Sequence, residues 1–518
     1  MANKSVFASL AGRLMPKATA QTAHGTGAYA YGTEHRLAQL AMTGTIGGGF
    51  YQDAEAEVTA LVAAAEAVDP LFLAKACVHV RAKGHMKDTP ALLLAVLASR
   101  DPALFALAFP KVVTSGKMLR TFVQILRSGR TGRKSLGSRP KAMVQGWLNG
   151  ASDAQLMAAM VGNDPSLADV IRMVHPKPET AERAAFYAWA IGKPADAAAL
   201  PQVVQDLMAF RAGASAKVPE VPFQMLSDLT LSPAQWAEVA GRASWATLRQ
   251  GLNMLNRKGA FAVPGVVEQA ASVLRDPTRI KAAKAMPYQL LATLRALEAG
   301  VDPRLREALH DAMEASVSNV PRLRGTVAVC PDVSGSMSSP VTGFRKGATT
   351  AVRCIDVAAL VAAAVLRANP QTRVLPFEVG VREVRLQARD TILTNAERLA
   401  ALGGGGTNCS APLAALNTAG VAPDLVIFVS DNQSWVDGRQ GGQATAMMAE
   451  WTKLKARNGA AKLVCIDIQP YGTSQAAERE DVLNIGGFSD AVFDQVAAFA
   501  EGRMGPDHWV GEIRSVSL

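Results

Sequence analysis

One stretch decides the fold of the second half of this chain: Thr326-Val-Ala-Val-Cys-Pro-Asp-Val-Ser-Gly-Ser-Met337. Its first residues form a short apolar run, which is typical of a β-strand buried on both faces. Asp332 follows this run, and two hydroxyl side chains come next at Ser334 and Ser336. In open parallel sheets, ligands bind beyond the carboxyl ends of the strands. These three side chains are therefore candidates for a binding site.

Predicted strands and helices alternate after this stretch. The alternation predicts a doubly wound α/β domain over residues 321–518, with helices on both faces of a sheet. Apolar runs predict further strands at residues 372–377, 381–387, 425–430 and 462–468. Helical spacing of apolar residues predicts helices at residues 356–368, 395–401, 444–456 and 490–500.

Two later strand ends carry further oxygen side chains. A glycine-rich loop, Gly403-Gly-Gly-Gly-Thr407-Asn408, precedes a predicted helix, and Asp431-Asn432 follows the strand at 425–430. Hard oxygen donors with few charges suit one divalent cation: Mg²⁺ first, with Mn²⁺ or Ca²⁺ as alternatives. Two carboxylates leave part of the ion's charge uncompensated, so an acidic group from a partner could complete the site. The predicted metal ligands are Asp332, Ser334, Ser336, Thr407 and Asp431.

The first 320 residues are basic and the remainder is neutral. Residues 1–320 hold 35 Lys and Arg against 25 Asp and Glu, whereas residues 321–518 hold 19 of each. No acidic residue occurs between Asp101 and Asp153, a window that holds nine cations. Concentrating one sign of charge costs self-repulsion, which a polyanion such as a nucleic acid relieves. A solvated basic face without a partner is the alternative. The nine cations are Lys111, Lys117, Arg120, Arg127, Arg130, Arg133, Lys134, Arg139 and Lys141.

Residues 25–320 are predicted to be almost entirely helical, after a flexible N-terminus at residues 1–24. A capping residue followed by proline occurs seven times, which predicts many short packed helices. Their irregular spacing favours an α-solenoid in the style of HEAT repeats. Glycine and proline predict a loop at residues 128–140. The seven capping residues that precede a proline are Asp69, Thr89, Asp101, Asp164, Ser232, Asp276 and Asp302.

Several classes of protein are disfavoured. The 5 cysteines form no C-x-x-C pair, which argues against a disulfide scaffold and a zinc ribbon. We find neither a signal peptide nor an apolar run of membrane-spanning length, so the cytoplasm is the expected compartment. No H-E-x-x-H motif or G-x-S-x-G elbow occurs, and two carboxylates are few for a two-metal nuclease. We therefore expect a protein that is not an enzyme.

Both halves together resemble the Ro family of RNA-binding proteins, whose helical part is called the TROVE domain. The D-x-S-x-S arrangement with Thr407 and Asp431 resembles the metal-ion-dependent adhesion site of von Willebrand factor A domains. The resemblance extends from about residue 25 to residue 500. The matching stretches are residues 44–51, 169–178, 326–337, 404–408, 430–432 and 486–490.

The resemblance implies a ring of helical repeats followed by a von Willebrand A domain. Family members bind small structured non-coding RNAs (Y RNAs) on a basic outer surface and pass single-stranded 3′ ends of misfolded RNAs through the central hole. Bacterial members work beside a 3′→5′ exoribonuclease in RNA quality control; neither DNA nor a membrane is an expected partner. By resemblance to the matching motif, the RNA contacts also include Arg172, His175 and Lys177.

Two other functions stay open. In the first, the metal site grips an acidic side chain of another protein, and the chain is an interaction adaptor. In the second, the metal site hydrolyses phosphodiesters or phosphate esters.

Overall fold

The computed structural model describes residues 17–22, 25–42, 54–84, 86–341, 352–431, 445–469, 473–486, 491–504 and 508–518. The chain divides into two compact units. The helical unit comprises residues 65–244, 251–269 and 516–518, and the sheet unit comprises residues 1–64, 245–250 and 270–515. Within the described part of the chain, none of the helices has both the length and the apolar character needed to cross a membrane.

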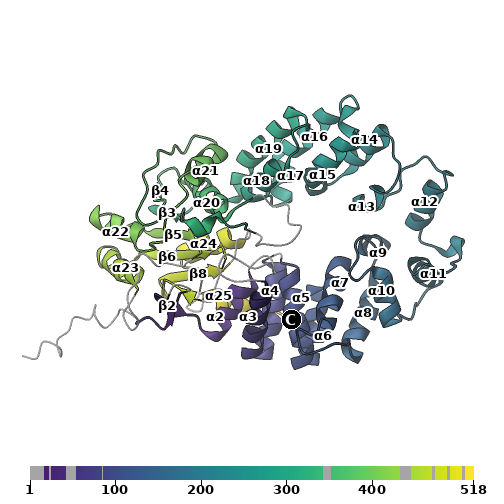
Figure 1. Ribbon diagram of the computed structural model, residues 1–518, viewed down its shortest axis with the longest axis horizontal. Helices are drawn as coiled ribbons and strands as arrows, with labels where there is room; N and C mark the ends of the chain where they lie inside the picture. The colour runs from purple at the N-terminus through teal and green to yellow at the C-terminus, as the bar shows by residue number, and fades with distance from the viewer. Residues whose placement is uncertain are drawn as a thin grey trace, which may run out of the picture. The chain divides into compact units, whose positions relative to one another are not determined.

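Short helices make up the helical unit (Figure 1). Helix α4 packs against α5 and α6, α5 against α7, α6 against α8, and α7 against α9 and α10. Contact of each helix with its next neighbours in sequence is typical of a helical solenoid. The helices are α4 (Pro70–Ala82), α5 (Asp88–Arg100), α6 (Pro102–Val112), α7 (Gly116–Arg127), α8 (Ser138–Gly150), α9 (Asp153–Ala159), α10 (Leu167–Val174), α11 (Ala181–Ala190), α12 (Gln202–Arg211), α13 (Phe223–Leu226) and α14 (Pro233–Arg242), with η1 (Ala197–Ala199) and η2 (Ala260–Ala262).

Five of the seven predicted helix starts are confirmed. The Asp69 side chain accepts hydrogen bonds from two backbone N–H groups of α4, as Asp101, Ser232, Asp276 and Asp302 accept from one or two in their own helices. These side chains satisfy N–H groups that have no partner within the helix.

The other two predicted starts are wrong. Thr89 lies inside α5, which already begins at Asp88, and Thr89 is buried. Helix α10 is capped by Ser166 rather than Asp164, since Ser166 and Asp169 form a reciprocal capping box. In α10 a second oxygen side chain thus takes the cap, whereas α5 begins after Lys87 without any side-chain cap.

The sheet unit contains a five-stranded parallel sheet in the order β4-β3-β5-β6-β8. Helix α20 packs on β3, β4 and β5, and α24 packs on β6. On the other face of the sheet, Leu413 of α22 and Trp451 of α23 pack on Cys330, Phe428 and Cys465. The strands are β3 (Val327–Pro331), β4 (Arg373–Val374), β5 (Leu425–Ser430), β6 (Lys462–Asp467) and β8 (Val482–Gly486), and the helices are α20 (Cys354–Ala368), α21 (Ile392–Ala400), α22 (Ala411–Thr418), α23 (Ala446–Arg457), α24 (Ala491–Ala500) and α25 (His508–Arg514).

Most of the predicted α/β elements are confirmed, and the exceptions are edge segments. The strand predicted at 381–387 is wrong: Val381 forms only an isolated β-bridge, and residues 382–387 form no strand. The predicted strand at 372–377 is reduced to β4. Strand β8, which the sequence did not predict, forms the other edge. Strand β4 has only two residues, one exposed and one half-buried, and so carries no apolar run, whereas all five residues of β8 are buried.

The N-terminal part of the chain joins the sheet unit, which the sequence did not predict. Strand β2 (Gly27–Ala30) pairs with β1 (Ala20–Gln21) and with β7 (Thr473–Ser474), and α2 (Thr33–Ala41) packs on β8. Tyr29 enters the core below α22 and α23. The predicted motif at 44–51 and most of the predicted flexible N-terminus lie outside the described residues, and the boundaries at 24 and 320 stay predictions.

Helices that precede β3 also pack in the sheet unit. Helix α18 contacts α20, and α19 contacts α21. The Arg295 guanidinium donates a hydrogen bond to the buried Asp356 carboxylate at 3.0 Å. The bounds of the two units divide α3 (Ala54–Ala67), α15 (Trp245–Arg257) and α16 (Val266–Arg275). The remaining helices of the sheet unit are α17 (Pro277–Ala282), α18 (Pro287–Ala296) and α19 (Pro303–Ser316), with η3 (Val317–Asn319) and η4 (Gly335–Ser338).

Candidate metal centre and basic surface

The predicted metal ligands meet where the order of the sheet reverses. From β3 the chain forms β4 on one side and β5 on the other, so the ends of β3 and β5 flank the switch point. Asp332 directly follows β3 and Asp431 directly follows β5. The backbone N–H of Asp332 donates to the carbonyl of Val429 at 2.9 Å, which holds the two ends together.

Asp332 is fully buried and hydrogen-bonded through both carboxylate oxygens. Oδ1 accepts from the backbone N–H of Ser334 at 2.8 Å, and Oδ2 accepts from the hydroxyl of Ser430 at 2.6 Å. The Oγ atoms of Ser334 and Ser336 lie 3.3 Å apart. Ser430 was not among the residues predicted for the site. Its position at the end of β5, level with Asp332, is the signal that identifies it.

The glycine-rich loop is bound to the segment that follows β3. The N–H of Gly404 donates to the carbonyl of Val333 at 2.9 Å, and the N–H of Gly335 donates to the carbonyl of Gly405 at 3.1 Å. Gly405 has a φ of 74°, and a Cβ there would also collide with the carboxylate of Glu378. Glycine is therefore required at 405, both for the backbone conformation and for space. This loop leads directly to Thr407.

The side chains of the site suit a hard cation. Asp332, Ser334, Ser336, Thr407 and Asp431 are all buried and offer only oxygen donors. Burial and the neighbouring Asp431 carboxylate raise the pKa of Asp332 to about 7. Both carboxylates are therefore ionised together only at an electrostatic cost, which a cation relieves. Among the described residues, no group of three or more His, Cys, Asp or Glu could hold an ion by itself. A metal ion at this site would therefore also need the hydroxyl donors.

Two groups of predicted RNA contacts, distant in sequence, come together in the helical unit. Helix α10 packs against both α7 and α8. The Arg127 guanidinium lies 2.8 Å from the sulfur of Met173, and Gln145 of α8 donates to the carbonyls of Val174 and His175 at 2.6 and 3.2 Å. The end of α7, the middle of α8 and the end of α10 therefore lie together, and the loop that follows α7 leads into the start of α8.

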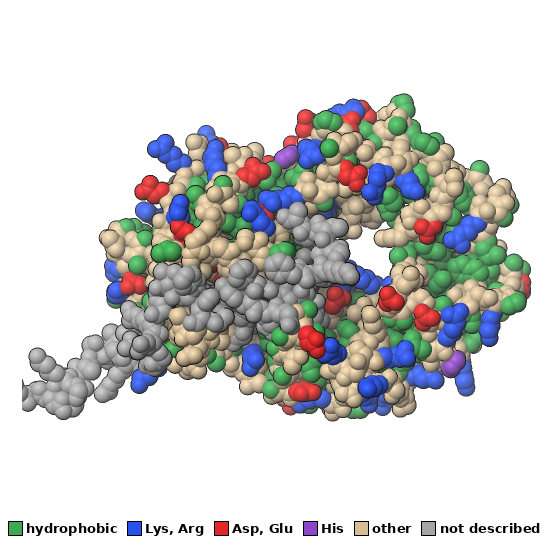
Figure 2. Space-filling view, in the orientation of Figure 1, with side chains coloured by type: hydrophobic (Ala, Val, Ile, Leu, Met, Phe, Trp, Pro, Cys, Tyr) green, Lys and Arg blue, Asp and Glu red, His purple; other side chains and the backbone are tan. Residues whose placement is uncertain are grey.

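We call this the α7–α10 surface. Figure 2 shows Lys and Arg side chains gathered over α6, α8 and α10. The loop predicted at 128–140 spans residues 128–137, and α8 begins at Ser138. His175 ends α10 in the left-handed conformation, with its side chain exposed. The exposed cations on the surface are Arg127, Arg130, Lys134, Arg139, Arg172 and Lys177, and Arg133 and Lys141 are half-buried.

Three of the predicted cations lie elsewhere. Arg120 is buried, and its guanidinium donates to the backbone carbonyls of Val161, Asn163 and Pro165. Burial lowers its pKa. Lys111, exposed at the end of α6, donates to the carbonyl of Ser517 at 3.0 Å, and Lys117 is exposed near the start of α7, at the end opposite Arg127. Arg120 thus serves the packing of the loop before α10.

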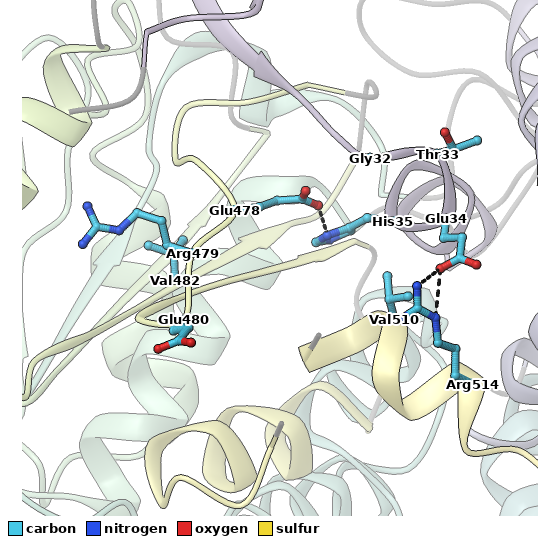
Figure 3. A pocket seen from close by; sticks show the side chains of 10 residues that line it. All are labelled: Gly32, Thr33, Glu34, His35, Glu478, Arg479, Glu480, Val482, Val510 and Arg514. Atoms are coloured by element: carbon cyan, nitrogen blue, oxygen red, sulfur yellow. Dashed lines mark hydrogen bonds and ion pairs between the residues drawn. The ribbon is translucent and has the colours of Figure 1, made fainter. Parts of the chain in front are cut away.

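A hollow of about 570 Å³ lies between α2, the segment before β8, and α25 (Figure 3). Four of the side chains that line it pair with one another: Glu34 with Arg514, and His35 with Glu478. The second ring nitrogen of His35 lies 3.2 Å from the carbonyl of Asn484 on β8. These contacts attach α2 to the sheet, so we assign no ligand to this hollow.

Fold and site together define a helical-solenoid protein whose sheet unit carries a von Willebrand A domain with an oxygen-donor site at its switch point. The comparisons agree with this class. Residues 324–500 match the family model described as the Ro60 vWA domain.

Relatives that span the whole chain are also found. The chain is 26% identical over 516 residues to the RNA-binding protein RO60 of Deinococcus radiodurans, covering 92% of this chain and 94% of the relative. The crystal structure of the Deinococcus radiodurans RO (RSR) protein matches 91% of this chain and 100% of its own, with a TM-score of 0.62 and 21% identity. These findings confirm the resemblance to the Ro family.

Proposed function

We propose that the chain is an RNA-binding protein without catalytic activity of its own. The observation that carries this proposal is the α7–α10 surface, where exposed cations from residues 127–141 and 172–177 lie together. Arginine and lysine neutralise phosphates and release the counterions of the nucleic acid, which gives affinity with little sequence preference. The name of the Deinococcus relative, an RNA-binding protein, supports the same function.

The proposed ligand of this surface is a small structured RNA of the Y RNA type. We further propose that single-stranded 3′ ends of misfolded or precursor RNAs enter a ring of the helical repeats, and that a 3′→5′ exoribonuclease acts on RNAs held in this way. In this role the protein is a scaffold of RNA quality control and the stress response in the cytoplasm. These finer points follow from the family resemblance.

The site at the switch point is proposed to hold one divalent cation, Mg²⁺ first, with Mn²⁺ or Ca²⁺ as alternatives. Asp332, Ser334, Ser336, Thr407 and Asp431 would hold the ion directly or through bound water. The ion would neutralise the two buried carboxylates and fix the loops that carry the hydroxyls.

Sequencing of the RNA that co-purifies with the full chain tests the RNA function. We expect enrichment of a small structured RNA, and a binding constant that falls steeply with added salt. A chain that carries no RNA and binds a stem–loop RNA no more strongly than bovine albumin does would contradict the proposal. Degradation of that RNA by the purified chain with Mg²⁺, lost on Asp431→Ala, would favour the hydrolytic alternative.

A further inference from the structure

The register of the sheet aligns a third acidic residue with the metal site. Pro331 of β3 pairs with Val429 of β5, so Asp332 is level with Ser430, and Ser430 pairs with Asp467 at the end of β6. Paired residues of parallel strands point to the same face of the sheet. Asp332, Ser430 and Asp467 therefore form one row across three neighbouring strands, with Ser430 in the middle.

Asp467 is enclosed like the predicted ligands. Its exposed fraction is 0%, equal to that of Asp332. Adjacent strands lie about 4.8 Å apart, which places the Cα atoms of Asp332 and Asp467 roughly 10 Å from each other. Burial raises the pKa of the Cys354 thiol at the start of α20, and the carboxylates of Asp431, Asp467 and Asp332 raise it further. The three acidic groups thus share one buried region.

The end of β6 is also attached to the loop that carries the hydroxyl donors. Gln469 lies two residues beyond Asp467. Its amide nitrogen donates to the carbonyl of Pro340 at 3.1 Å, and its amide oxygen accepts from the hydroxyl of Ser339 at 3.4 Å. The end of β6 therefore contacts the segment that directly follows Ser334 and Ser336.

We propose that Asp467 is a third carboxylate of the metal centre, which strengthens cation binding through its charge and through metal-bound water without contacting the ion. This inference rests on the metal site proposed above. At a protein dielectric of about 20, unit charges roughly 8 Å apart still attract strongly enough to change a binding constant by about tenfold or more. The negative charge of three carboxylates also exceeds the positive charge of a divalent ion, so the site would retain the ion without an acidic group from a partner. The adaptor hypothesis is weakened accordingly.

The test compares the full-length wild type with Asp467→Asn, by thermal unfolding in EDTA and in Mg²⁺ and by calorimetric titration with Mg²⁺ and Mn²⁺. We expect the variant to bind Mg²⁺ roughly tenfold or more weakly. Its Tm in EDTA should be unchanged or higher, because a repelling charge is gone, while the rise in Tm on adding Mg²⁺ should shrink. If Asp467→Asn does not fold, the smaller neutral variant Asp467→Ser takes its place.

Asp424→Asn is the matched control. Asp424 directly precedes the central strand β5, at the end of that strand opposite Asp431, where it accepts hydrogen bonds from Thr326 and Asn458. Its loss should lower Tm equally with and without Mg²⁺. If Asp467→Asn behaves in the same way, or keeps the wild-type affinity for Mg²⁺, Asp467 has only a structural role and the inference is wrong. If the wild type itself gains no stability from any divalent cation, the proposed metal site fails.

Discussion

Neutralising three cations of the α7–α10 surface should weaken RNA binding in a way that depends on salt. The triple variant Arg130→Gln, Lys134→Gln and Arg139→Gln removes three exposed charges from one loop and the start of the next helix. Each phosphate contact contributes roughly 0.7–0.9 to the slope of log K against log salt. If all three cations contact phosphates, the slope should become shallower by about 2–2.7.

This change in slope determines how much more RNA affinity the wild type loses than the variant when salt is added. Between 50 and 200 mM salt, the wild type should lose roughly 20- to 40-fold more affinity than the variant. Fluorescence anisotropy with a labelled stem–loop RNA over this range measures both slopes. The matched control replaces three exposed arginines of the sheet unit, Arg373, Arg385 and Arg389. Equal slopes for the wild type and the surface triple, or an equal loss in the control, would refute the assignment of this surface.

Three further predictions concern stability. Arg120→Ala should destabilise the helical unit by about 3 kcal/mol, because three backbone carbonyls lose a charged hydrogen-bond donor. The RNA affinity, measured by fluorescence anisotropy, should stay at the wild-type value. A loss of RNA affinity without a loss of stability would contradict the structural role of Arg120. Gly116→Ala should lower Tm in a thermal melt, because the added Cβ would collide with Ala159 and force α7 and α9 apart. The control Gly146→Ala should not lower Tm, since the Cβ added there meets no other atom. Equal effects of the two substitutions would contradict the close packing of α7 on α9. The raised pKa of Asp332, about 7 against the ordinary 3.8, means that the folded metal-free protein binds more protons than the unfolded chain between these values. Its stability should therefore fall by up to about 4 kcal/mol as pH rises from about 4 to about 7, in urea titrations with EDTA; Asp332→Asn should flatten the profile, and an unchanged profile would exclude Asp332 as its cause.

The central strands were predictable because burial on both faces gives them a continuous apolar run. Strand β5 has the predicted bounds, Leu425–Ser430, and β3 and β6 each differ by one residue at an end. Residues 381–387 carry similar apolar residues, but an arginine or glutamate interrupts them at nearly every second position. In the structure, Arg382 and Arg385 are exposed, and no strand forms. Alternation alone therefore overpredicted an edge strand.

The contacts of the N-terminal segment could not be predicted, because they depend on pairing across the whole chain. Tyr29 on β2 pairs with Ser474 on β7, more than 400 residues later. Neither strand has a distinctive pattern, since β7 has two residues and β2 has four. The sequence shows which side chains are apolar, but the partner of so short a strand is set by the surface that it covers.

The order of the strands explains why the metal ligands were predictable and Asp467 was not. Asp332, Thr407 and Asp431 stand beside motifs that can be recognised from spacing alone, namely D-x-S-x-S, a glycine run and the end of an apolar strand. Asp467 is the last residue of an apolar strand and carries no motif. Its relation to Asp332 depends on β5 lying between β3 and β6, and on Ser430 being level with both. A one-residue shift of β6 would turn Asp467 to the other face of the sheet, so its place in the row is a property of the register.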